Sequence, residues 1–219
     1  MTKSRVPISF TTAVLSALTY GIFAAVAFSK NPQPLSPLRN WLSDLGNQIT
    51  NPQGAIFYNI GVVSCALFLA LWFTAGLHQW KLKDHTIQQR LLLVAQVGGI
   101  LTAFALMMSA LFPINHLKEH AFWSDLNFIL FGLSFAFTVA ALRYHPKMPR
   151  ILLFIGGLAA ILPTMVLFIN NAYWLEWIAV GLFIIYILSI GIAAHTFAIQ
   201  QTNSSDIEGS VRTRKELPE

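Results

Sequence analysis

Long apolar segments alternate with short polar connections along almost the whole chain. A helix needs about 20 mostly apolar residues to cross the roughly 30 Å hydrocarbon core of a bilayer. Six stretches meet this requirement, each bounded by charged residues, Pro or Asn: Pro7–Ser29, Ala55–Gly76, Leu91–Phe112, Ala121–Leu142, Ile151–Ile169 and Tyr173–Phe197. The pattern predicts an all-α fold, a polytopic six-helix transmembrane bundle in which residues 1–199 form a single domain. The polar residues 200–219, of mixed charge, predict a disordered cytoplasmic tail.

The composition excludes a soluble globular protein. Of the 219 residues, 55% are apolar and only 11% are charged, whereas soluble chains average about 25% charged residues. Ala25-Val26-Ala27, near the end of the first stretch, resembles a signal-peptide cleavage site. We interpret that stretch as a retained span, because its apolar run is longer than that of a typical signal peptide.

Basic residues predict the orientation. If the N-terminus is cytoplasmic, eleven of the fourteen Lys and Arg residues fall in cytoplasmic segments, and only Lys30, Arg39 and Lys118 lie outside. Because cytoplasmic connections are enriched in Lys and Arg, both termini are predicted to be cytoplasmic. The net charge of +5 then reflects topology and contact with membrane lipids, and no nucleic-acid partner is predicted.

The longest connection, Lys30–Gly54, predicts a short interfacial helix in the first outer loop. Ser36 can serve as its N-cap, Pro37 suits the first helical position and Gly46 can end it. One apolar stripe follows helical spacing over Pro37–Leu45: Leu38, Trp41, Leu42 and Leu45. We expect this helix to cover the outer mouth of the bundle.

The fourth span carries a polar stripe that must face protein or water, since unsatisfied polar groups are costly in hydrocarbon. Its members share one helix face: His116, His120, Ser124, Asn127, Ser134 and Thr138. His116 and His120 are four residues apart, a separation compatible with a divalent metal. The alternative is that both are neutral and form hydrogen bonds at the interface, with no cofactor.

Three outer residues are candidates for catalysis: Asp44, His120 and Glu176. In a hydrolytic mechanism His120 would act as a base and Asp44 would orient it, so their side chains should approach within about 4 Å or share a metal or water. Glu176, flanked by two belt tryptophans, would close the cluster from the last span. Ser43, Asn51, Asn59 and Trp41 are candidates for substrate binding.

Two stretches of the sequence resemble a known family. Ser43-Asp44-Leu45-Gly46, followed by Asn51-Pro52 and Phe57-Tyr58-Asn59-Ile60-Gly61, resembles the signature of domain-of-unknown-function family nine-nine-eight, and Phe112-Pro113 with His120 resembles its second landmark. The resemblance implies a six-span protein of the prokaryotic plasma membrane, with Ser43, Asp44, Asn51, Asn59 and His120 as motif positions. The family is distantly similar, in span pattern alone, to autophagy-modulator and GPI-anchor-remodelling membrane proteins.

Three functions remain open. The first is a protein or enzyme that binds a lipid head group or a lipid-linked substrate at the extracytoplasmic face, where the polar candidates converge. The second is a non-catalytic scaffold or regulatory subunit that engages another membrane protein through its outer loop. A small-molecule carrier is disfavoured because no charged residue lies near the centre of any span.

Overall fold

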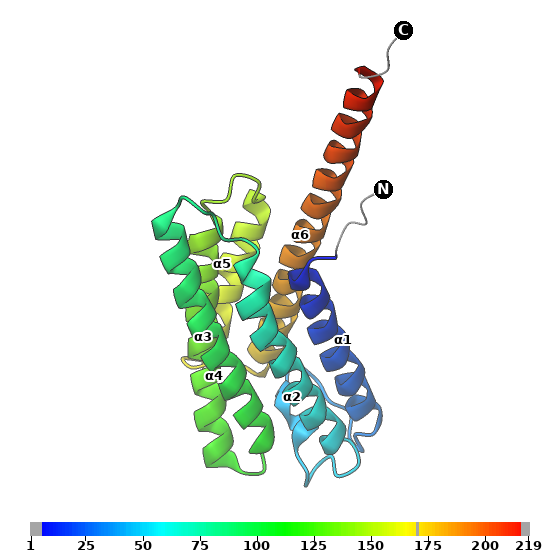
Figure 1. The fold of residues 1–219 in the computed structure, drawn as a ribbon. Helices are drawn as coiled ribbons and strands as arrows, with labels where there is room; N and C mark the ends of the chain where they lie inside the picture. The colour runs from blue at the N-terminus through cyan, green and yellow to red at the C-terminus, as the bar shows by residue number, and fades with distance from the viewer. Residues whose placement is uncertain (1–5, 170, 216–219) are drawn as a thin grey trace.

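The chain folds into a ring of helices in sequential order (Figure 1). The computed structural model describes residues 6–169 and 171–215, with side chains up to Gln201. Each helix packs against the next, and the last returns to the first, which confirms the predicted all-α bundle. In chain order the described elements are α1 (Ile8–Ser29), the 3-10 helix η1 (Leu42–Gly46), α2 (Ala55–Leu71), the π-helix η2 (Trp72–Gly76), α3 (Thr86–Leu111), α4 (Leu117–Leu142), α5 (Arg150–Met165) and α6 (Tyr173–Lys215).

In the described part of the chain, five helices are long and apolar enough to cross a membrane: Ile8–Ser29, Ala55–Gly76, Thr86–Leu111, Leu117–Leu142 and Tyr173–Gln201. Large apolar side chains such as Ile22, Leu93 and Phe154 are exposed on their outer faces and on α5. A soluble protein rarely exposes so much apolar surface, so this surface faces lipid. The chain is a membrane protein.

Helix α5 has 16 residues and is the shortest of the apolar helices. Pro163 lies inside it, and proline removes one helical hydrogen bond and displaces the preceding turn. Hydrogen-bonded turns nevertheless continue to Ile169, whose N–H donates to Met165 O at 3.2 Å. The end of the fifth predicted span therefore consists of turns rather than α-helix.

Helix α6 continues to Lys215, where the sequence predicted a disordered tail from residue 200. Adding residues to an existing helix costs far less than nucleating a new one, so the long apolar helix can extend into a polar segment. Residues 216–219 lie outside the described part of the chain. The start of α1 and the end of α6 lie toward the same end of the bundle, opposite the α1–α2 loop and the α3–α4 connection (Figure 1).

Aromatic side chains fill the middle of the bundle. Trp72, Phe73, Phe135 and Tyr186 are fully buried, and their rings contact one another. A Cβ on Gly99 would lie 1.9 Å from the ring of Phe73. Glycine at this position therefore lets α3 accept the large side chain presented by η2.

Gly156 and Gly157 on α5 occupy opposite environments. A Cβ on Gly156 would lie 2.5 Å from Val139 of α4 and 2.6 Å from the ring of Tyr186 of α6. A Cβ on Gly157 would meet nothing within 4 Å. Only the first glycine is required for close helix approach.

We predict that Gly156→Ala lowers the thermal stability of the purified protein, since overpacking costs about 1–3 kcal/mol. Gly157→Ala is the matched control, and it should leave stability unchanged or raise it by less than about 1 kcal/mol, because alanine favours helix. Thermal unfolding in one detergent measures both. Equal losses in the two variants would contradict this packing.

Candidate functional site

A single carboxylate joins the long loop to the start of α6. Glu176 Oε2 accepts hydrogen bonds from the N–H of Leu42 at 2.7 Å and from the N–H and hydroxyl of Ser43 at 3.4 and 3.5 Å. At the next residue, the Trp177 indole N–H donates to Asn40 O at 3.0 Å. The first turns of α6 therefore hold the loop against the bundle.

The loop does not form the continuous helix predicted over Pro37–Leu45. A single turn starts at Ser36, Trp41 is extended, and the 3-10 helix Leu42–Gly46 follows. The apolar stripe is split, with Leu42 and Leu45 buried while Leu38 is 76% exposed.

Carboxylates account for this break. In a continuous helix the N–H groups of Trp41 and Leu42 would bond to carbonyls four residues earlier. The N–H of Trp41 instead donates to Asp44 Oδ2 at 2.9 Å, and that of Leu42 donates to Glu176. Asp44 is half-buried, and burial raises the pKa of its carboxyl above the ordinary value, while the bond from Trp41 opposes this shift.

Two asparagines hold the return of the loop into α2. Asn51 is fully buried; its Nδ2 donates to Leu45 O at 2.9 Å and Ala27 O at 3.2 Å, and its Oδ1 accepts from the Gly54 N–H. Asn59 Nδ2 donates to Gly46 O at 3.1 Å. Both amides, predicted to bind substrate, thus have partners within the protein.

The imidazole of His120 is buried between α3 and α4. Its Nδ1 lies 3.0 Å from Ser109 O and 2.9 Å from Phe112 O, and its Nε2 lies 3.2 Å from Ser124 Oγ. Carbonyl oxygens only accept, so Nδ1 carries the proton of a neutral ring and Nε2 accepts from the Ser124 hydroxyl. Nε2 is thus available as a base.

A cavity of about 70 Å³ lies between these groups. That volume is enough for several water molecules, since one needs about 10–15 Å³ of such space. The cavity brings together four sequence-predicted residues: Ser43, Asn59, His120 and Glu176. Trp41, Asp44, Asn51 and His116 are not among the residues that line it.

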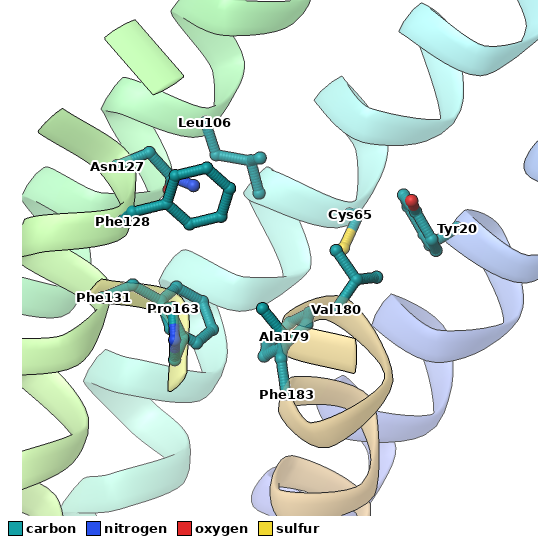
Figure 2. Close-up of a pocket in the computed structure, with 10 residues that line it drawn as sticks. All are labelled: Tyr20, Cys65, Leu106, Asn127, Phe128, Phe131, Pro163, Ala179, Val180 and Phe183. Carbon is teal, nitrogen blue, oxygen red and sulfur yellow. The ribbon is translucent and has the colours of Figure 1, made fainter. Parts of the chain in front are cut away.

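A second cavity of about 50 Å³ lies beside it inside the bundle, and residues of all six helices α1–α6 line it (Figure 2). Its lining is apolar except for three polar groups, the Tyr20 hydroxyl, the Cys65 thiol and the Asn127 amide. The Asn127 Oδ1 is buried without a hydrogen-bond partner. The two cavities share five lining residues: Tyr20, Leu106, Asn127, Phe128 and Val180. A polar space therefore adjoins an apolar one.

Sequence reasoning missed two tyrosines. The hydroxyls of Tyr20 and Tyr58 lie 3.2 Å apart, and both rings line the polar cavity. Each lies in an apolar span with no polar stripe, so no periodic signal marked them. Ser124 and Asn127 did stand on the predicted polar stripe.

The expected direct pairing of Asp44 with His120 is absent: in the described part of the chain, no hydrogen bond or ion pair joins them, and Asp44 bonds to Trp41. The two histidines also separate. His116 is exposed at the N-cap of α4, whereas His120 is buried. Among described residues no three His, Cys, Asp or Glu side chains group as metal ligands.

The chain matches no model of a known protein family, no curated protein and no solved structure. The resemblance to domain-of-unknown-function family nine-nine-eight therefore stays a prediction that rests on its motif residues.

Removing the Glu176 carboxylate should release the loop. We predict that Glu176→Ala speeds trypsin cleavage after the exposed Arg39, because an unsatisfied buried N–H costs about 1–3 kcal/mol. Glu176→Gln keeps an acceptor oxygen and should give an intermediate rate. Glu119→Ala, which alters an exposed residue of α4, is the control. A cleavage rate identical to that of the unmodified protein in Glu176→Ala would contradict this role.

Proposed function

We propose that this membrane protein binds the polar head group of a lipid or a lipid-linked molecule beneath its α1–α2 loop. The observation that carries the proposal is the adjoining pair of cavities. One presents His120, Ser124 and Glu176, and the other is lined mainly by apolar side chains. Such a pair suits an amphiphile, whose head and chain need different surroundings.

The same site offers a route to hydrolysis. For a bound ester, Nε2 of His120 would take the hydroxyl proton of Ser124 as Ser124 Oγ attacks the ester carbonyl, and would return it to the leaving alcohol; water would then release the acyl group. The carbonyls of Ser109 and Phe112 orient the ring through Nδ1, the role that was expected of Asp44. Glu176 is occupied by the loop, so its role is to position Ser43 rather than to react.

A scaffold is the second candidate. Leu38 and Ile49 are 76% and 77% exposed on an otherwise well-bonded loop. Exposed apolar side chains at a loop surface favour contact with another membrane protein.

We further propose six spans, with α5 and its following turns as the fifth, in a prokaryotic plasma membrane. The 16 residues of α5 rise about 24 Å, and the turns up to Ile169 extend the segment toward the roughly 30 Å that a span needs. Among the described residues, Lys and Arg gather in and beside the α2–α3 and α4–α5 connections, at the end of the bundle that holds the start of α1, which supports cytoplasmic termini and an external α1–α2 loop.

Filling the apolar cavity tests lipid binding. We predict that Ala179→Leu, which adds bulk at a buried lining position, reduces the amount of co-purified lipid seen by native mass spectrometry about tenfold, as overpacking of about 1–3 kcal/mol would do. Gly181→Leu lies on the same helix with open space around it and should retain the lipid. Equal lipid content in both variants would overturn the proposal.

Single cysteines test the topology. In a Cys65→Ala background, Ile49→Cys should react with a membrane-impermeant thiol reagent on intact cells, whereas Lys83→Cys and Lys147→Cys should react only after lysis. All three positions are exposed in the structure. Labelling of Lys83→Cys or of Lys147→Cys on intact cells would overturn the orientation. Asn171→Cys, at an exposed position of the α5–α6 connection, should react on intact cells because α5 crosses the membrane, and labelling of it only after lysis would overturn the six-span topology.

A further inference from the structure

A large groove opens at the other end of the bundle, near the two termini. Its volume is about 740 Å³, within the range of about 300–1,000 Å³ typical of ligand sites. It is formed by the start of α1, the segment after η2, the α4–α5 connection and the middle of α6. It shares no lining residue with the two cavities beneath the α1–α2 loop.

One wall of the groove is apolar and aromatic. Val6, Ile8, Ala194 and Phe197 contribute aliphatic and aromatic surface. The ring of Trp80 lies 5.8 Å from that of Phe197, centroid to centroid. A small soluble ion would make no favourable contact with this apolar wall. A ligand that fills the groove therefore needs an apolar part.

The rim of the groove carries one cation beside a histidine. The Lys147 ammonium lies 5.8 Å from the centre of the Phe197 ring, and the His145 ring lies 5.0 Å from that of Trp80. No acidic side chain is among the described residues that line the groove. Burial, and secondarily the charge of Lys147, lower the pKa of His145, so its neutral ring can donate a hydrogen bond to a phosphate while Lys147 supplies the positive charge.

We propose that this groove binds an anionic phospholipid, with the phosphate beside Lys147 and His145 and an acyl chain along the wall made by Ile8 and Phe197. The charge complementarity selects an anion, and the apolar wall selects an anion that carries a hydrocarbon chain. The site is distinct from the head-group cavity of the proposed function and does not depend on it.

Lipid titration of the full chain in detergent, followed by native mass spectrometry, tests the site. The lipids are phosphatidylglycerol and phosphatidylcholine with matched chains. Lys147→Gln should weaken phosphatidylglycerol binding about fivefold, the effect of losing one basic contact to an anionic lipid. Lys83→Gln, an exposed charge at the same end outside the groove, should leave binding unchanged.

Three outcomes would overturn the proposal. Equal weakening by the two variants would indicate a general effect of surface charge. Equal affinity for phosphatidylcholine, which carries the same phosphate but no net charge, would show that the groove does not select an anionic lipid. Competition by inorganic phosphate at the concentration of the lipid would indicate a site for soluble anions. The thermal stability of Lys147→Gln is also measured in phosphatidylcholine. An unchanged stability shows that weaker lipid binding does not result from misfolding.

Discussion

The bond between the Glu176 carboxylate and the backbone of η1 is the constraint on which the loop end of the molecule depends. An N–H group placed over an apolar bundle must find an acceptor, and the N–H of Leu42 finds one from a helix 134 residues later in the chain. The same carboxylate lies in the first turn of α6, where the helix dipole also favours negative charge. With η1 fixed, Leu42 and Leu45 become buried with Tyr58 and Val62 in a small core of their own. The polar cavity lies under this cover.

His120 joins the end of α3 to α4 and also presents its Nε2 to the polar cavity. Ser109 O belongs to the last turn of α3, where carbonyls lack partners within the helix, and Phe112 is the C-cap residue. The Nδ1 proton satisfies both carbonyls, which ties the end of α3 to α4. Because this contact fixes the ring and its tautomer, Nε2 is left facing Ser124 and the cavity.

Some of this could be predicted from the sequence and some could not. The five long spans follow directly from hydropathy, and the polar stripe on α4 correctly placed His120, Ser124 and Asn127 toward the interior, because a bilayer excludes polar groups from its lipid face. The prediction of one continuous helix over Pro37–Leu45 was wrong. The spacing of Leu38, Trp41 and Leu42 is helical, but local periodicity contains no information about a carboxylate in another helix. Asp44 was expected to pair with His120 directly or through a metal or water. No direct hydrogen bond joins them among the described residues, and Asp44 Oδ2 accepts from the N–H of Trp41 and caps η1, a local bond that was equally compatible with the sequence. A metal or water shared by Asp44 and His120 stays a prediction.

The arrangement along the bundle axis bears on which function the fold can serve. The cavity beneath the α1–α2 loop contains the Glu176 carboxylate and the His120 ring, whereas the groove at the other end is lined by Lys147 and His145 and by no acidic side chain among the described residues. The contacting rings of Trp72, Phe73, Phe135 and Tyr186 fill the core of the bundle and are fully buried. Moving a solute from one end to the other would require separating these rings, and close-packed interiors resist such displacement. The two proposed amphiphile sites, one at each end of the bundle, are consistent with this closed core, whereas a carrier would require the core to open.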